Sequence, residues 1–159
     1  MSELVKAIEG KSTIYHGEID PGEFDVLCEY LESPECSFTK LEVFGDENIN
    51  LDIYALTKSL KTNNTLITLY LYNNNIGVEG AKALAESLKI NNTLSVLDLF
   101  NNNIGNVGCI ALAESLKINN TLRGLGLLHN NIGVDGTKAL AESLKTNNTL
   151  RGLDLRYNN

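Results

Sequence analysis

Residues 65–92 read TLITLYLYNNNIGVEGAKALAESLKINN, and nearly the same phrase returns at 93–120 and 121–148. Each later copy is identical to the first at 20 of 28 positions, with no insertion or deletion between copies. The words Asn-Asn-Thr-Leu mark every junction, including one before the first copy and one after the third. A fixed period of this length is typical of a repeat architecture, in which each unit packs on its neighbours.

The apolar pattern changes halfway through a unit. Leu69 and Leu71 lie two residues apart, which predicts a strand with one buried face. From residue 78 to 89 the apolar residues recur every three or four positions, which predicts a half-buried helix. This stretch is also rich in Ala, Leu, Glu and Lys, which are strong helix formers. Each unit is therefore predicted to be one strand followed by one helix.

The residues of the unit carry a specific resemblance. The pattern Leu-x-x-Leu-x-Leu-x-x-Asn-x-Ile starts at Leu66, and Gly80, Leu84 and Leu88 follow it. The unit resembles the leucine-rich repeat of the ribonuclease-inhibitor type, whose units carry a full α-helix. The resemblance implies an α/β solenoid with a parallel β-sheet inside and helices outside. Packed helices need about 8–10 Å and paired strands about 4.8 Å, so the stack must curve, with the sheet on its concave face.

The resemblance extends over most of the chain and predicts a single domain over 1–159. The residues before 65 fit two atypical units, as the ends of a solenoid require for capping. The predicted parts are a degenerate N-terminal unit or cap (1–36), a degenerate repeat (37–64), three regular 28-residue repeats (65–92, 93–120 and 121–148) and a partial repeat (149–159).

Composition and charge exclude several classes of function. The 159 residues carry 13 Lys and Arg against 20 Asp and Glu, a net charge of −7, so nucleic-acid binding is not predicted. No apolar run reaches the roughly 20 residues that cross a bilayer, and the N-terminus has no apolar signal core. Three cysteines with no disulfide or zinc spacing are predicted to be buried thiols in a reducing compartment. We therefore expect a cytoplasmic protein without membrane insertion.

Motifs for chemistry are missing from the sequence. It has no phosphate-binding Gly-rich loop, no His-Glu-x-x-His and no cluster of Cys and His with metal-ligand spacing. Neither a cofactor nor a metal is predicted, and the chain is expected not to be an enzyme. The GTPase-activating protein for Ran has similar repeats, so regulation of a small GTPase stays an alternative, although a shared fold does not carry over a function.

The positions that vary between units predict the functional surface. If the leucines of each strand point inward, the residues between them lie on the concave face. The third column of this face is almost entirely large and apolar: Tyr15, Phe44, Tyr72, Phe100, Leu128 and Arg156. Exposed aromatic stripes are typical of protein-binding sites, although cross-strand stacking of the rings is a structural alternative. With their neighbours, the residues predicted to bind a protein partner are Tyr15, Phe44, Tyr70, Tyr72, Asp98, Phe100, Leu128, His129, Arg156 and Tyr157.

Two further predictions concern the turns and the last unit. Asn74, Asn102, Asn130 and Asn158 follow the strands, and an amide side chain there can satisfy buried turn backbone. Residues 149–159 supply a strand without its helix, which leaves a sheet edge uncovered. This predicts either self-association through that edge or a longer natural protein. One alternative is that the chain is the recognition portion of a larger protein. Another is a bacterial effector that acts in host cytosol, because the near-identical units and the Asn-Asn-Thr-Leu phrase look like the rapidly duplicating arrays of intracellular bacteria and protists.

Overall fold

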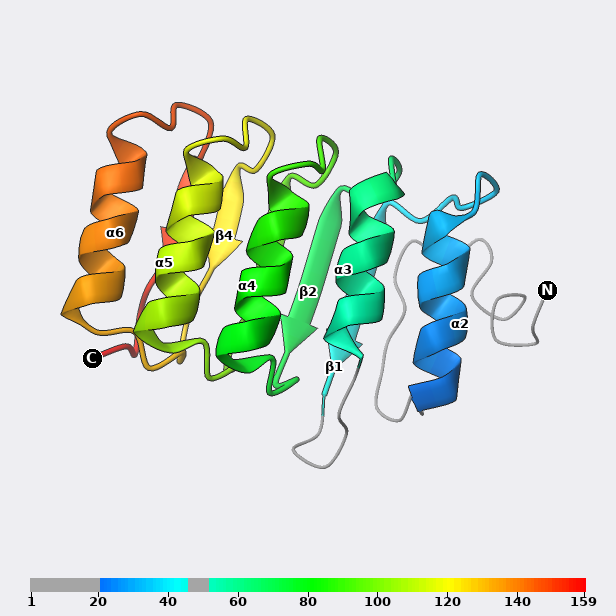
Figure 1. The fold of residues 1–159 in the computed structure, drawn as a ribbon, viewed down its shortest axis with the longest axis horizontal. Helices are drawn as coiled ribbons and strands as arrows, with labels where there is room; N and C mark the ends of the chain where they lie inside the picture. Colours follow the sequence, from blue (N-terminus) through cyan, green and yellow to red (C-terminus); the bar gives the residue numbers. More distant parts are fainter. Residues whose placement is uncertain (1–20, 46–51) are drawn as a thin grey trace.

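The structure, a computed structural model, describes residues 21–45 and 52–159 as strands alternating with helices (Figure 1). The helices lie side by side in one layer over one face of the sheet. The helices are α2 (Pro21–Glu32), α3 (Ile53–Thr62), α4 (Gly77–Leu88), α5 (Gly105–Leu116) and α6 (Val134–Leu144). The strands are β1 (Lys40–Phe44), β2 (Thr68–Tyr72), β3 (Val96–Asp98), β4 (Gly124–Gly126) and β5 (Gly152–Asp154).

The described strands form one parallel sheet in chain order, β1-β2-β3-β4-β5. The register follows the sequence period, since Leu69 pairs with Leu97, Leu97 with Leu125 and Leu125 with Leu153. Each helix from α3 to α6 is the crossover that a parallel strand pair needs, whereas α2 precedes β1. The predicted α/β leucine-rich-repeat solenoid, with strands on the concave face and helices on the convex face, is confirmed.

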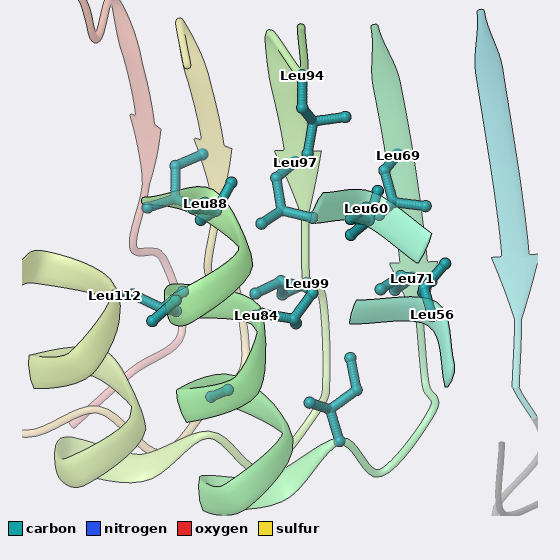
Figure 2. Packing of buried hydrophobic residues seen from close by; sticks show 14 of the residues in the cluster. Leu56, Leu60, Leu69, Leu71, Leu84, Leu88, Leu94, Leu97, Leu99 and Leu112 are labelled. Carbon is teal, nitrogen blue, oxygen red and sulfur yellow. The ribbon is translucent and has the colours of Figure 1, made fainter. Parts of the chain in front are cut away.

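The core lies between the sheet and the helix layer. Leu69, Leu71, Leu97 and Leu99 point from the strands toward the helices, and each is at most 1 % exposed. Figure 2 shows Leu99 beside Leu84 and Leu71 beside Leu56. Burying one leucine stabilises the fold by about 1.5–3 kcal/mol, so these residues determine which face of each strand is hidden.

The first-turn glycines of the helices allow close packing. A Cβ on Gly108 would lie 2.7 Å from Cγ2 of Ile104 and 2.8 Å from Cβ of Ala81 on the neighbouring helix. The left-handed backbone occurs instead at Gly77 and Gly105, the first residues of α4 and α5, with φ of 63° and 62°. Close helix packing and the left-handed backbone are therefore provided by two different glycines of the unit, three residues apart.

Helix α6 begins differently from its neighbours. Asn106, near the start of α5, accepts hydrogen bonds on Oδ1 from the amides of Gly133 (2.8 Å) and Gly136 (2.9 Å). The matching positions of the adjacent units are Val78 and Val134, whose side chains cannot accept a hydrogen bond. A side chain of one unit therefore caps the helix of the next.

The three cysteines are free and buried, in agreement with the sequence prediction. Burial raises the pKa of both Cys28 and Cys109 to about 12. These thiols are therefore neutral and inert near pH 7.

Candidate protein-binding surface

The residues between the inward leucines form rows across the sheet. In β2, Leu69 and Leu71 are buried, whereas Thr68, Tyr70 and Tyr72 are partly exposed on the other face. Parallel register aligns their equivalents in the other strands. One row is Lys40, Thr68, Val96, Gly124 and Gly152, and the next is Glu42, Tyr70, Asp98, Gly126 and Asp154.

Aromatic and imidazole rings form a continuous line along one margin of this face, which we call the ring row. Successive centroids are 4.9, 6.1, 5.9 and 4.8 Å apart. Tyr70 stacks beside the row, 5.4 Å from Tyr72. Such spacings are those of interacting ring pairs. The members of the ring row, in order, are Phe44, Tyr72, Phe100, His129 and Tyr157.

The ring row shifts by one sequence position along its length. Phe44, Tyr72 and Phe100 occupy the third column that the sequence indicates, but the line continues through His129 and Tyr157. Leu128 and Arg156, the third-column residues of those units, are not members. A row drawn by equivalent positions alone misses this shift, because in the last two units the ring is carried by the residue after the third-column position.

His129 and Tyr157 reach the row from a left-handed backbone conformation. Their φ angles are 53° and 55°, and the equivalent residues Asn73 and Asn101 have φ of 58° and 52°. Asparagine tolerates this conformation well, whereas it costs other non-glycine residues about 1 kcal/mol or more. The two rings therefore occupy positions where local conformational preference favours another residue.

Ion pairs lie at both ends of the face. Lys40 Nζ is 2.5 Å from Glu42 Oε1 and lies over the Tyr70 ring, 5.1 Å from its centroid. At the other end, Arg156 binds Asp154 through two nitrogens, at 3.0 and 2.7 Å, and this hydrogen bonding lowers the pKa of Asp154. Arg156 thus neutralises a carboxylate of its own unit.

Asp98 lies at the centre of the face. Its Oδ1 accepts a hydrogen bond from the Phe100 amide at 3.0 Å. Burial raises the pKa of Asp98 and the charge of Asp154 adds to the rise, while the Phe100 bond opposes it. A Cβ on Gly126 would collide with the Asp98 carboxylate, so any other residue there would force the Asp98 side chain to move. Burial, followed by the nearby Asp98 charge, likewise raises the pKa of Tyr72.

The asparagines after the strands form a buried row at the turns. Asn102 Nδ2 donates to the Leu71 carbonyl of the preceding unit, and its Oδ1 accepts from the amides of Asn74 (2.9 Å) and Ile76 (3.4 Å). The same donor bond to the preceding unit recurs for the other three. These bonds are Asn74 to Val43, Asn130 to Leu99 and Asn158 to Leu127.

A second asparagine row joins the units at the opposite end, and sequence reasoning did not assign it this role. Asn91 Nδ2 donates to the Leu60 carbonyl at 2.7 Å, and its Oδ1 accepts from the amides of Thr93 and Leu94. Asn63, Asn119 and Asn147 make the corresponding bonds. The signal was the invariant first residue of the Asn-Asn-Thr-Leu phrase.

The predicted contact residues fall into three groups in the structure. Phe44, Tyr70, Tyr72, Phe100, His129 and Tyr157 are in ring contact with one another. Asp98 lies on the same face outside the ring row, Arg156 binds Asp154 of that face, and Leu128 is half-buried just after β4. Tyr15 lies outside the described residues.

The convex face presents paired charges. Glu86, Glu114 and Glu142 each lie 2.5–2.6 Å from the lysine three residues further on. Within residues 21–45 and 52–159, no three His, Cys, Asp or Glu side chains gather as metal ligands. None of the described helices is long and apolar enough to cross a membrane.

Comparisons with known proteins agree with this fold. The sequence profile of the family described as "Leucine Rich repeat" matches residues 62–85 and 91–113. The chain is 39 % identical over 71 residues to the rat (Rattus norvegicus) protein "NACHT, LRR and PYD domains-containing protein 3", and 31 % identical over 84 residues to its human counterpart. These matches cover 43 % and 52 % of the chain but only 7 % and 8 % of the relatives.

The solved structure of "Leiomodin-1 Actin-Binding Site 2 (ABS2)" superimposes with a TM-score of 0.75 at 27 % identity. The superposition covers 87 % of this chain and 80 % of that one. Repeat pattern, sheet register, family profile and structural likeness agree, and the chain is a leucine-rich-repeat protein. Its full-helix units are compatible with the ribonuclease-inhibitor-like subtype.

Proposed function

We propose that the chain is a non-catalytic recognition module that binds a protein partner on its concave sheet face. The contact surface comprises the ring row with Tyr70, Asp98, Leu128 and Arg156, and the sequence pattern adds Tyr15, which lies outside the described residues. Stable recognition needs about 800 Å² on each partner, which five strands and their turns can supply. Rings are over-represented among the residues that dominate the binding energy of such surfaces.

The ring row is the observation that carries this proposal. Five rings follow one another at the carboxyl ends of the five described strands, with Phe44 and Tyr72 as the last residues of β1 and β2 and the other three in the segments after β3, β4 and β5. Packing of the core does not require rings there. Two of them also stand at left-handed positions that favour asparagine. Exposed, contiguous apolar groups of this kind are typical of binding sites.

The comparisons support the same class of function. The leiomodin-1 segment is named as an actin-binding site, so a closely similar fold serves protein recognition in that molecule. Because the chain spans less than a tenth of the curated relatives it matches, a recognition portion of a larger protein is a natural variant of the proposal. Action in the cytoplasm, or in host cytosol for a delivered effector, and the unit boundaries given above belong to the same proposal.

Quantitative affinity purification tests the proposal. Wild-type protein and the variant Tyr72→Ala/Phe100→Ala are used as bait in cell extract, and retained proteins are compared by mass spectrometry. We expect at least one partner whose affinity falls tenfold or more with the variant, since the variant removes the middle of the ring row. The variant removes four ring contacts, which together contribute about 2–6 kcal/mol, so circular dichroism is used to verify that it remains folded.

A convex-face variant provides the matched control. Val107→Ala/Ile110→Ala removes two exposed apolar side chains from α5, where they are 52 % and 37 % exposed. Partners of the concave face should bind this control like wild type. Partners that bind Tyr72→Ala/Phe100→Ala as tightly as wild type would contradict the assignment of the face.

A further inference from the structure

Two glycines of the concave face lack a structural reason. Gly124 and Gly152 occupy the row where the other strands carry Lys40, Thr68 and Val96. A Cβ on Gly152 would meet no atom within 4 Å, and one on Gly124 would make only ordinary contacts with Val96 at 3.6 Å or more. Neither has a positive φ. Glycine within a strand costs about 0.5–1 kcal/mol and often marks close approach of another backbone.

Two arginines precede these glycines. Arg123 and Arg151 directly precede β4 and β5 at equivalent positions, and the Arg151 amide donates to the Arg123 carbonyl at 2.7 Å. Both side chains are exposed, and among the described residues neither forms an ion pair. Like charges on neighbouring strands, about 4.8 Å apart, repel each other. The two preceding units carry Ile67 and Ser95 at this position, so the repeat itself does not require arginine.

We propose that β4 and β5 form a seat for an extended acidic segment of the partner protein. This inference rests on the proposed function of the concave face. The partner backbone lies directly over Gly124 and Gly152, which have no side chains, and a carboxylate side chain of the partner binds Arg123 and Arg151. Guanidinium groups suit this role because they bind carboxylates with two parallel hydrogen bonds.

The surrounding charges favour an acidic peptide over a nucleic acid. Asp98 and Asp154 lie on the same face, and the whole chain carries −7, so a continuous polyphosphate would be repelled along most of its length. A single carboxylate needs only the local arginine pair. His129 and Tyr157 follow the carboxyl ends of β4 and β5, whereas Arg123 and Arg151 precede the amino ends of these strands. An apolar side chain several residues away in the partner segment would therefore meet these rings.

Selection from a displayed library of random 12-residue peptides tests the partner chemistry. Peptides selected on the wild-type protein should be enriched in Asp and Glu relative to the unselected library. Their affinity, measured by fluorescence anisotropy on synthetic copies, should fall at least tenfold for Arg123→Ser/Arg151→Ser, which restores the residue type of Ser95. The control Lys61→Ser/Lys138→Ser removes the same charge from exposed helix positions and should leave affinity within twofold.

The role of the two glycines in binding is tested by Gly124→Thr/Gly152→Thr, which introduces the residue that β2 carries as Thr68. The melting temperature should be unchanged or higher, because threonine favours strands and lowers the entropy of the unfolded chain. Binding of the selected peptides should nevertheless fall tenfold or more, because the new side chains fill the seat. A stably folded variant that keeps wild-type affinity would overturn the seat.

The outcomes separate this inference from the proposed function. Two outcomes would overturn the acidic seat but agree with a binding site on the concave face. In one, the selected peptides depend on Tyr72 and Phe100 but are not enriched in Asp and Glu. In the other, they lose equal affinity for the arginine variant and the lysine variant. Selected peptides that depend on neither the ring row nor the arginines contradict both.

Discussion

Asparagine occurs at both bends of every regular unit because one amide group supplies a donor and an acceptor. Asn102 uses both: it donates to Leu71 in the preceding unit and accepts from Asn74 and Ile76. Buried backbone groups at a turn have no water to replace these bonds, so their satisfaction is a condition for folding. At the residue scale, then, units are joined by amide hydrogen bonds as well as by leucines.

We predict that Asn102→Ala destabilises the protein by about 2–4 kcal/mol, since several buried backbone groups lose a partner. Urea unfolding followed by circular dichroism measures the change. Asn101→Gly is the matched control, because Asn101 is exposed, bonds only Asn73 through its side chain and has a left-handed backbone that glycine accepts. It should cost less than about 1 kcal/mol. Equal losses for the two variants would disprove the structural role of the buried row.

The helices show how near-identical units become different elements. α4 and α5 begin at a left-handed glycine, whereas α6 begins after Gly133 with an extended backbone and receives its cap from Asn106. The first amides of a helix have no partner within the helix, so an external acceptor stabilises its start. One substitution relative to the repeat consensus thus changes the start of the neighbouring helix.

We predict that Asn106→Val, which restores the residue of the adjacent units, destabilises the protein by about 1–2 kcal/mol through the loss of this cap. Hydrogen exchange at the Gly136 amide should accelerate more than exchange within α4. The exposed Asn120, which makes no hydrogen bond within the described part of the chain, provides the control Asn120→Ala. If Gly136 keeps its protection in Asn106→Val, the cap is not the source of α6 stability.

The whole molecule separates its faces by chemistry. The leucine layer holds strands to helices, the convex face carries Glu–Lys pairs, and the concave face carries the ring row and the seat of Arg123, Arg151, Gly124 and Gly152. Buried neutral thiols in the helix layer make its stability depend on pH, because the unfolded state releases protons that the folded state retains.

We predict that the free energy of unfolding falls as pH rises from about 9 toward 12. The pKa of Cys28 and Cys109 is raised from 9.0 to about 12 in the folded state, so their contribution is complete below pH 9 and is lost across that interval. Urea unfolding at pH 8 and pH 10.5 measures the fall. Cys109→Ala, which matches Ala81 of the preceding unit, should show a shallower fall. An identical pH dependence in both proteins would contradict the assignment to Cys109.

Most of the fold was predictable from the repeat. The period of 28, the switch from strand to helix spacing and the inward leucines predicted the parallel sheet and its register. The predicted helix over 78–89 is observed as Gly77–Leu88. The third column of the strands indicated three of the five members of the ring row, because Phe44, Tyr72 and Phe100 occupy equivalent positions.

The local sequence pattern therefore determined the strand and helix of each unit, because the same leucines are buried in every unit and each unit packs against similar neighbours. Only the tertiary structure decided what the departures from the repeat do together. His129 and Tyr157 join the ring row through a left-handed turn, Asn106 caps another unit's helix, and Arg123 and Arg151 become adjacent although 28 residues separate them. The physical reason is that side chains distant in sequence interact only after strand pairing places them about 4.8 Å apart.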